Sequence, residues 1–175
     1  MSKLSIAISA EDHMQGDTAA ECSLVEYGDY ECPHCGRAYP IVKRLQKYFA
    51  RRLSFVFRNF PLSQIHPWAE PAAEAAEFAG THGKFWEMHD MLFENQESLG
   101  DTLFWELADR IDLSPLQLKT AVAEKTYSAR VRADFAGGAR SGVNGTPTFF
   151  INGQRHNGSF DYDILRDAIE KAMGL

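Results

Sequence analysis

The 175-residue sequence is poor in cysteine, in long apolar runs and in net positive charge. Three cysteines are too few for the disulfide framework of a small secreted domain, which uses a larger, even number. No run of about 18 apolar residues occurs, so no membrane insertion is expected. A formal net charge of −6 disfavours nucleic acid as a partner. What is left is a globular chain of ordinary composition, long enough for one domain.

The N-terminus lacks the features of a signal peptide. The apolar run from Leu4 to Ala10 is short and contains two serines, which makes a poor h-region. We therefore expect a cytoplasmic location, or a periplasmic or other extracytoplasmic one if the sequence is the mature form of an exported protein. Residues 1–21 are polar and are predicted to form an N-terminal extension that loops over the surface.

Acidic and basic residues are unevenly distributed along the chain. Residues 32–69 contain seven Lys or Arg and no Asp or Glu, whereas residues 70–112 contain eleven acidic residues and two basic ones. The simpler interpretation is a pair of solvated helix faces of opposite sign. The functional interpretation is that the basic segment favours a thiolate where it begins.

The apolar pattern predicts strands at both ends of the chain and helices between them. The predicted strands span residues 23–27, 53–57, 148–151 and 154–156. The last two are joined at Asn152-Gly153, a strong hairpin signal. Helical spacing follows Pro33, continues throughout residues 67–142 and returns after Asp161. We therefore predict an α/β domain built from residues 22–66 and 143–175, with 67–142 inserted as an all-helical subdomain.

The most informative motif is Cys32-Pro33-His34-Cys35, at the start of the first predicted helix. Residues i and i+3 of a helix have Cβ atoms about 5–6 Å apart, close to the roughly 3.5–4.5 Å of a disulfide. The helix N-terminus favours negative charge at Cys32. Pro33 suits the first turn, and His34 adds donors and, when protonated, a cation. The pattern predicts a redox couple in which Cys32 attacks and Cys35 resolves.

Two other interpretations of the pair stay open but are less favoured. A Cys-x-x-Cys knuckle can form half of a zinc site, which needs two further ligands. No second knuckle exists, and His82 and His89 are spaced i, i+7 rather than i, i+4. If the two cysteines were inert buried thiols, proline and histidine would be unusual residues to find between them in a core. Cys22 lies about 16 Å away along the preceding strand and is predicted to be a small core residue.

The segments around the pair resemble DsbA-type thiol-disulfide oxidoreductases of the thioredoxin superfamily. "SLVEYGDYECPHCG" is similar to their strand-to-active-site segment, and "GVNGTPTFFING" is similar to their cis-proline loop and hairpin. The helical block resembles the insertion that marks this branch. The resemblance covers roughly residues 20–175. It implies a thioredoxin-like fold with an inserted all-helical subdomain.

The resemblance also implies roles for residues outside the pair. Thr146-Pro147 is implied to be a cis peptide in a loop that binds an extended substrate through its backbone. Glu26 is implied to be a buried acid that relays protons to the second cysteine; an exposed strand glutamate is the alternative. From its position alone, His66 is expected to order the turn before the helical block; the alternative is that it faces the active site. The tryptophans expected to fill the core are Trp68, Trp86 and Trp105.

We therefore expect a monomeric oxidoreductase that forms a mixed disulfide with protein thiol or disulfide substrates at Cys32. It is expected to need no metal and no cofactor beyond the Cys32–Cys35 disulfide, and to be recycled by an unidentified redox partner. The alternatives are a metal-binding or metal-delivery protein, a thioredoxin-fold module that binds without turnover, and a glutathione-linked enzyme. The Pro-His dipeptide favours an oxidant, and the absence of a signal peptide favours a reducing compartment.

Overall fold

The computed structural model describes residues 2–175 and contains a five-stranded mixed sheet in the order β1-β3-β2-β4-β5. Its strands are β1 (His13–Gln15), β2 (Cys22–Gly28), β3 (Leu53–Asn59), β4 (Thr148–Ile151) and β5 (Gln154–Arg155). β2 pairs in parallel with β3, and all other pairs are antiparallel. β2 is central and covered on both faces, which explains its nearly continuous apolar sequence.

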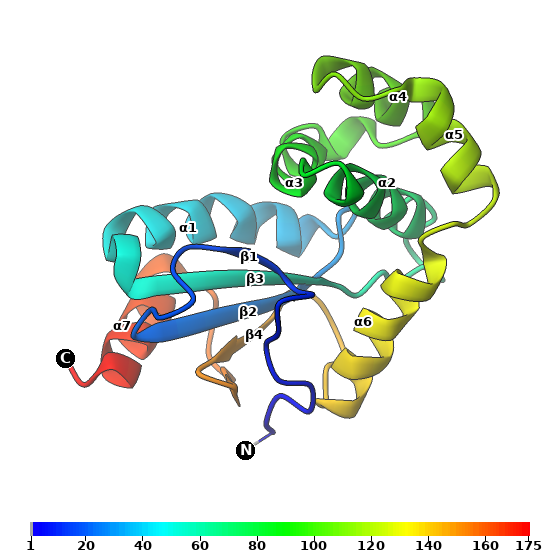
Figure 1. Ribbon diagram of the computed structural model, residues 1–175. Coiled ribbons are helices and arrows are strands. Elements are labelled where there is room, and N and C mark those ends of the chain that lie inside the picture. Colours follow the sequence, from blue (N-terminus) through cyan, green and yellow to red (C-terminus); the bar gives the residue numbers. More distant parts are fainter. Residues whose placement is uncertain (1) are drawn as a thin grey trace.

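Seven α-helices accompany the sheet within the described residues. They are α1 (Pro33–Phe49), α2 (Ala69–Thr81), α3 (Phe85–Glu94), α4 (Asp101–Arg110), α5 (Pro115–Ala123), α6 (Ser128–Arg140) and α7 (Tyr162–Met173), with short 3-10 turns η1 (Ala50–Arg52) and η2 (Gln96–Ser98). Helices α2 to α5 gather above one end of the sheet (Figure 1). This is the predicted thioredoxin-like fold with a helical insertion.

The two faces of the sheet carry separate apolar clusters. Leu24 of β2 belongs to the cluster shared with α1, α7 and the insertion, whereas Val25 and Tyr27 belong to the cluster on the opposite face. Figure 1 shows α1 and α6 on opposite sides of the sheet. α6 approaches closely because Gly138 lacks a side chain; a Cβ there would lie 2.7 Å from the ring of Phe60. The last helix of the predicted insertion therefore also covers the sheet.

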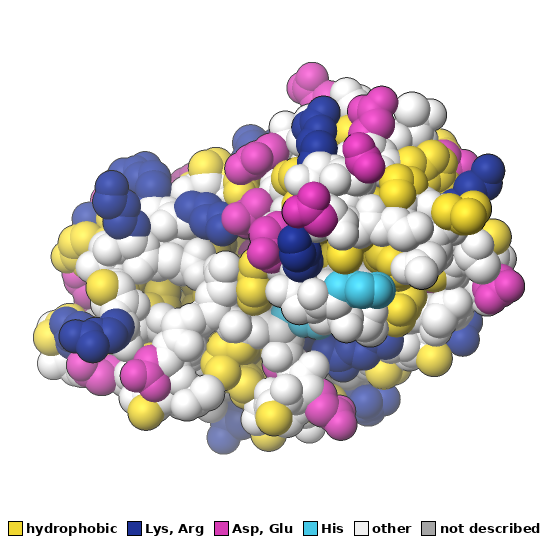
Figure 2. All heavy atoms as spheres, turned by 45° about the horizontal axis from the view of Figure 1, so that its top comes forward, with side chains coloured by type: hydrophobic (Ala, Val, Ile, Leu, Met, Phe, Trp, Pro, Cys, Tyr) yellow, Lys and Arg dark blue, Asp and Glu magenta, His cyan; other side chains and the backbone are white. Residues whose placement is uncertain are grey.

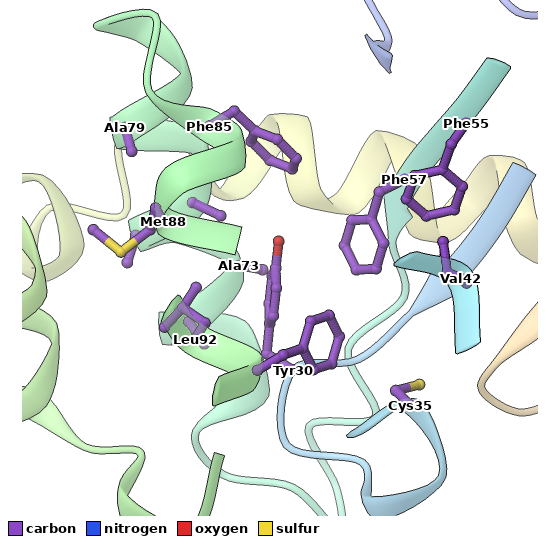
Figure 3. Close-up of a cluster of buried hydrophobic side chains, with 14 of the residues drawn as sticks. Tyr30, Cys35, Val42, Phe55, Phe57, Ala73, Ala79, Phe85, Met88 and Leu92 are labelled. Atoms are coloured by element: carbon purple, nitrogen blue, oxygen red, sulfur yellow. The ribbon is translucent and has the colours of Figure 1, made fainter. Parts of the chain in front are cut away.

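One apolar core continues from the sheet into the insertion. Figure 3 shows Tyr30 between Phe57 of β3 and the α3 side chains Met88 and Leu92. The Tyr30 hydroxyl lies 3.0 Å from Nδ1 of His89, which is itself buried. Burial lowers the pKa of His89 well below its usual value, so the ring is neutral. The active-site segment is thus anchored in the insertion through Tyr30. Three tryptophans pack half-buried against this core, as expected: Trp68, Trp86 and Trp105.

The N-terminal segment is more ordered than the predicted surface loop over residues 1–21. His13–Gln15 form β1 and pair with Phe55–Phe57 of β3, and Lys3 forms an isolated bridge with Gln154. The prediction of a loop is therefore wrong for these residues. A three-residue strand is too short to show a recognisable alternation, and its position is set by tertiary pairing.

The charges on the surface follow the uneven distribution seen in the sequence. In Figure 2, acidic side chains gather over the helical insertion at the top, and basic ones lie at the left, over the far end of α1 and η1. Lys47 lies in the last turn of α1, and Arg51 and Arg52 lie in η1. Because cations are favoured at a helix C-terminus, most of the basic segment behaves as a solvated surface rather than as part of the dithiol.

Candidate active site

The dithiol lies where β2 leads into α1. Cys32 is the N-cap of α1 and Pro33 occupies the first turn, where its missing N–H leaves no helical bond unmade. The N–H of Gly36 donates to the Cys32 carbonyl at 3.1 Å, which closes the first turn. All three cysteines are free thiols; Cys35 has no exposed surface and Cys32 keeps 4%. Cys22 is buried at the opposite end of β2, as expected.

The surroundings of Cys32 favour its thiolate. Its pKa is lowered from 9.0 to about 5, first by hydrogen bonding from Cys35 and then by the Thr146 side chain and the N–H groups of Cys35 and His34, while burial opposes the shift. The N–H groups belong to the first turn of α1, whose dipole points the same way. Cys32 is therefore the more acidic thiol of the pair.

Cys35 and Glu26 lie deeper and favour their protonated forms. Burial, the hydrogen bond to Cys32 and the charge of Glu26 raise the pKa of Cys35 well above its usual value. Burial and the Cys32 charge raise the pKa of Glu26 from 4.5 to about 8. Glu26 Oε1 is enclosed with no hydrogen-bond partner among residues 2–175. A carboxyl group with a pKa of about 8 is mostly protonated at neutrality but still ionises in part, which suits proton exchange with the neighbouring thiol.

The loop before β4 completes the site. The peptide bond between Thr146 and Pro147 is cis, as expected. The Cys32 thiol donates to the Thr146 carbonyl oxygen, with 3.4 Å between the two atoms. The chain then enters β4, which pairs with β2, so the sheet itself brings the two distant motifs together.

His34 contributes to the site differently from the expectation. Its ring is exposed, and Nδ1 accepts a hydrogen bond of 2.6 Å from the Arg37 guanidinium. Its effect on the Cys32 pKa comes through the backbone N–H rather than through the imidazole. The ring is therefore turned toward Arg37 and along the helix surface.

Two side chains that the sequence did not single out hold the active-site turn. The buried Asp29 carboxylate accepts the N–H groups of Glu31 at 2.8 Å and Cys32 at 3.2 Å. Gln96 of η2 donates to the carbonyl oxygens of Tyr30 at 2.7 Å and Cys32 at 2.9 Å. An Asp that accepts the N–H two residues on is an Asx turn, which is a local sequence signal. Gln96 comes from a distant part of the chain and offers no such signal.

The histidines considered as metal ligands have other partners. His82 Nδ1 lies 2.9 Å from the Phe78 carbonyl, and His89 bonds to Tyr30 in the core. Within the part of the chain that the structure describes, no three His, Cys, Asp or Glu residues gather in a group able to hold a metal ion. What the site offers is a thiol pair, a buried acid and exposed backbone.

A dithiol at the start of α1 lies against a cis-proline loop, and this arrangement is that of the thioredoxin-fold class. The thioredoxin family model matches residues 9–171, and the chain belongs to this family. Among solved structures it resembles BdbD from Bacillus subtilis, with 27% identity, a TM-score of 0.84 and coverage of 93% of this chain and 92% of that one. It also resembles a thioredoxin-like oxidoreductase from Silicibacter pomeroyi, with 25% identity, a TM-score of 0.83 and 95% coverage of both chains. The fold is also that of alpha-DsbA1 from Wolbachia pipientis, with 19% identity and a TM-score of 0.82.

Curated relatives carry a different name. Over 162 residues, 93% of this chain, it is 43% identical to the Na(+)/H(+) antiporter NhaA 1 of Salinispora arenicola, of which it covers 25%. It is 37% identical over 169 residues to the Na(+)/H(+) antiporter NhaA of Nitrosospira multiformis, of which it covers 26%. The chain thus spans about a quarter of these relatives. Across residues 2–175, each helix is too short or too polar to cross a bilayer.

Proposed function

We propose that the protein is a thiol-disulfide oxidoreductase that exchanges electrons with protein substrates through Cys32 and Cys35. One observation carries the proposal: the pKa of Cys32 is lowered to about 5 while that of Cys35 is raised. Near neutrality only one thiol of the pair is then a thiolate. An attacking and a resolving cysteine need this division, because the thiolate is the nucleophile in disulfide exchange.

The exchange balances with the residues present and needs no further cofactor. In the reducing direction the Cys32 thiolate attacks a substrate disulfide, forms a mixed disulfide and expels one substrate thiolate. Cys35 then gives its proton to Glu26 in its ionised form and attacks Cys32 Sγ, which expels the second substrate thiolate. The substrate has gained two electrons, and the protein is left with a Cys32–Cys35 disulfide. The reverse sequence oxidises a substrate dithiol.

The lowered pKa of Cys32 favours the oxidising direction. A stabilised thiolate stabilises the reduced form, which makes the disulfide form the stronger oxidant. In this direction the protein gives its disulfide to substrate thiols and is reoxidised by a partner. The loop at Thr146-Pro147 supports binding of an extended segment through backbone groups. A reduction potential of about −120 mV for the Cys32–Cys35 pair, measured against glutathione, would indicate an oxidase. A potential of about −270 mV would indicate a reductase.

Insulin reduction in the presence of dithiothreitol tests the function. The Cys32→Ser variant should lose the activity, whereas the matched control Cys22→Ser should keep it. If Cys32→Ser reduced insulin at the wild-type rate, the proposal would be wrong. The Cys35→Ser variant should accumulate a mixed disulfide with substrate, which mass spectrometry under non-reducing conditions detects.

The antiporter relatives favour a second candidate, a redox unit whose substrate is a membrane cation antiporter. Its support is the 43% identity over 93% of this chain to part of a protein named as such. The Cys35→Ser variant would be incubated with membranes that contain such an antiporter, and trapped proteins identified by mass spectrometry. Recovery of the antiporter as a mixed disulfide supports this candidate, and its absence among the trapped proteins excludes it.

A further inference from the structure

A hydrogen-bonded link runs from the active-site turn to the loop that enters the insertion. Asp29 accepts the N–H groups of Glu31 and Cys32 on Oδ1, at 2.8 and 3.2 Å. Its Oδ2 accepts the N–H of Leu62 at 2.9 Å and lies 2.8 Å from Nδ1 of His66. One carboxylate therefore holds together two loops that are distant in the sequence.

This carboxylate depends on its partners because its side chain is wholly buried, whereas the His66 side chain keeps 16% exposure. An ionised carboxylate only accepts hydrogen bonds, so Nδ1 of His66 carries the shared proton. Without the His66 donor, Oδ2 of Asp29 would accept a hydrogen bond only from the N–H of Leu62. A buried, incompletely bonded carboxylate is costly, and the surrounding backbone would move to relieve it.

Asp29 also reaches the second cysteine. Its own backbone N–H points at Cys35 Sγ, 3.5 Å away. A shift of Asp29 would therefore disturb the turn before Cys32 and the environment of Cys35 together. The N–H groups that stabilise the Cys32 thiolate lie in the turn of α1 that follows directly.

We propose that His66 is a positioning residue of the dithiol: its Nδ1–H holds Asp29, and Asp29 holds the backbone that presents the first turn of α1 to Cys32. This inference rests on the proposed redox function, because it assigns His66 to the same site. His66 acts through Asp29 and not on a sulfur atom. Its contribution is one donated hydrogen bond, and the charge of the imidazole is not required.

Two amide variants separate the hydrogen bond from other properties of the ring. In His66→Asn the amide nitrogen occupies the place of Nδ1 and can donate to Asp29. In His66→Gln the amide nitrogen extends to the place of Nε2, where it no longer donates to the Asp29 carboxylate. His82→Ala is the matched control, since it removes a histidine whose partners are the Phe78 carbonyl and the Thr81 hydroxyl, away from the dithiol.

The readout is the pH titration of the Cys32 thiolate in the reduced protein, followed by ultraviolet absorbance. Cys22 and Cys35 do not interfere, because burial raises the pKa of both. We expect His66→Gln to raise the Cys32 pKa by about one unit, a roughly tenfold smaller thiolate fraction on the acid side. His66→Asn and His82→Ala should keep the wild-type value.

Either of two results would overturn the proposal. An unchanged Cys32 pKa in His66→Gln would show that the link does not reach the thiol, and an equal rise in His66→Asn would show that the bond is not the cause. If His66→Gln does not fold, nitrogen NMR of the wild-type protein tests the proposal by showing which ring nitrogen of His66 carries the proton. A deprotonated Nδ1 would exclude the hydrogen bond to Asp29. The titration reads the sulfur directly, so these results are independent of whether the wild-type protein reduces insulin.

Discussion

Cys32 Sγ lies 3.4 Å from the carbonyl oxygen of Thr146, a residue 114 positions further along the chain. The contact exists only once β4 has paired with β2, because that pairing carries Thr146 to the start of α1. The Thr146 side chain also helps to lower the Cys32 pKa. The reactivity of the dithiol therefore depends on the assembled sheet and not on the Cys-Pro-His-Cys turn alone.

Cys32 should be the only cysteine that iodoacetamide modifies in mildly acidic solution. Its pKa is about 5, whereas burial raises the pKa of Cys22 to about 11 and that of Cys35 well above its usual value. The rate of modification should be constant near neutrality and fall about tenfold per pH unit below the Cys32 pKa. Peptide mass spectrometry after timed quenching gives the rate for each thiol. Faster labelling of Cys35 would contradict the assignment of roles.

Replacing Glu26 should change the pH dependence of stability. Its pKa is raised from 4.5 to about 8, so its contribution favours the native state fully below pH 4.5 and is lost as the pH rises through about 8. Glu26→Gln stays neutral and should become progressively more stable than the wild type over this range. By linkage the full shift corresponds to about 5 kcal/mol, and the gain should be smaller in the oxidised protein, where the Cys32 charge no longer raises the Glu26 pKa.

Urea unfolding of the oxidised proteins at several pH values measures this difference, since oxidation removes the titration of Cys32. Glu106→Gln, on an exposed position of α4, controls for the loss of one acidic residue. A stability difference for Glu26→Gln that does not vary with pH would show that the fold does not raise the pKa of Glu26.

Gly36 and Gln96 should be energetically coupled. A Cβ at position 36 would collide with the Gln96 side chain, so Gly36→Ala should cost about 1–3 kcal/mol of stability. Gln96→Ala removes two hydrogen bonds to backbone carbonyls and should cost about 1–2 kcal/mol. In the double variant the collision is absent, so the total cost should be smaller than the sum. A double-mutant cycle measures the coupling, and strict additivity would disprove the contact.

Cys22→Ala should leave turnover intact. Cys22 is 1% exposed and lies at the opposite end of β2 from the dithiol. The substitution removes a small buried side chain and should cost about 1 kcal/mol of stability. Insulin reduction and thermal unfolding measured side by side check both expectations. A loss of turnover without unfolding would mean that Cys22 takes part in the exchange.

The elements that carry the site could be predicted because their signals are local. β2 and β3 are short runs rich in apolar and β-forming residues, and α1 follows the helical spacing that begins at Pro33. The Cys-Pro-His-Cys turn and the Thr146-Pro147 loop are likewise short contiguous motifs. Such patterns are set by neighbours in the chain, so they can be read without knowledge of the tertiary structure.

The supporting contacts could not be predicted because they join distant segments. Asp29 shows an Asx-turn pattern, but nothing nearby indicates that its other oxygen bonds to Leu62 and His66. Gln96 lies in a short 3-10 turn without apolar periodicity. The ring of His34 turns toward Arg37, a choice among rotamers that residue type and spacing do not determine. For Asp29 and Gln96 the partner comes from a distant segment, whereas for His34 it is a neighbour in the same helix.

Residues 2–15 have a consequence for how molecules of this protein behave toward one another. Ser2–Leu4 run alongside β5 at one edge of the sheet, through the Lys3–Gln154 bridge and two flanking backbone hydrogen bonds. His13–Gln15 cover β3 at the other edge. Open strand edges recruit strands from other chains, and very short edge strands are poor templates for such pairing. A single segment thus shields both edges of the sheet from strand-to-strand aggregation.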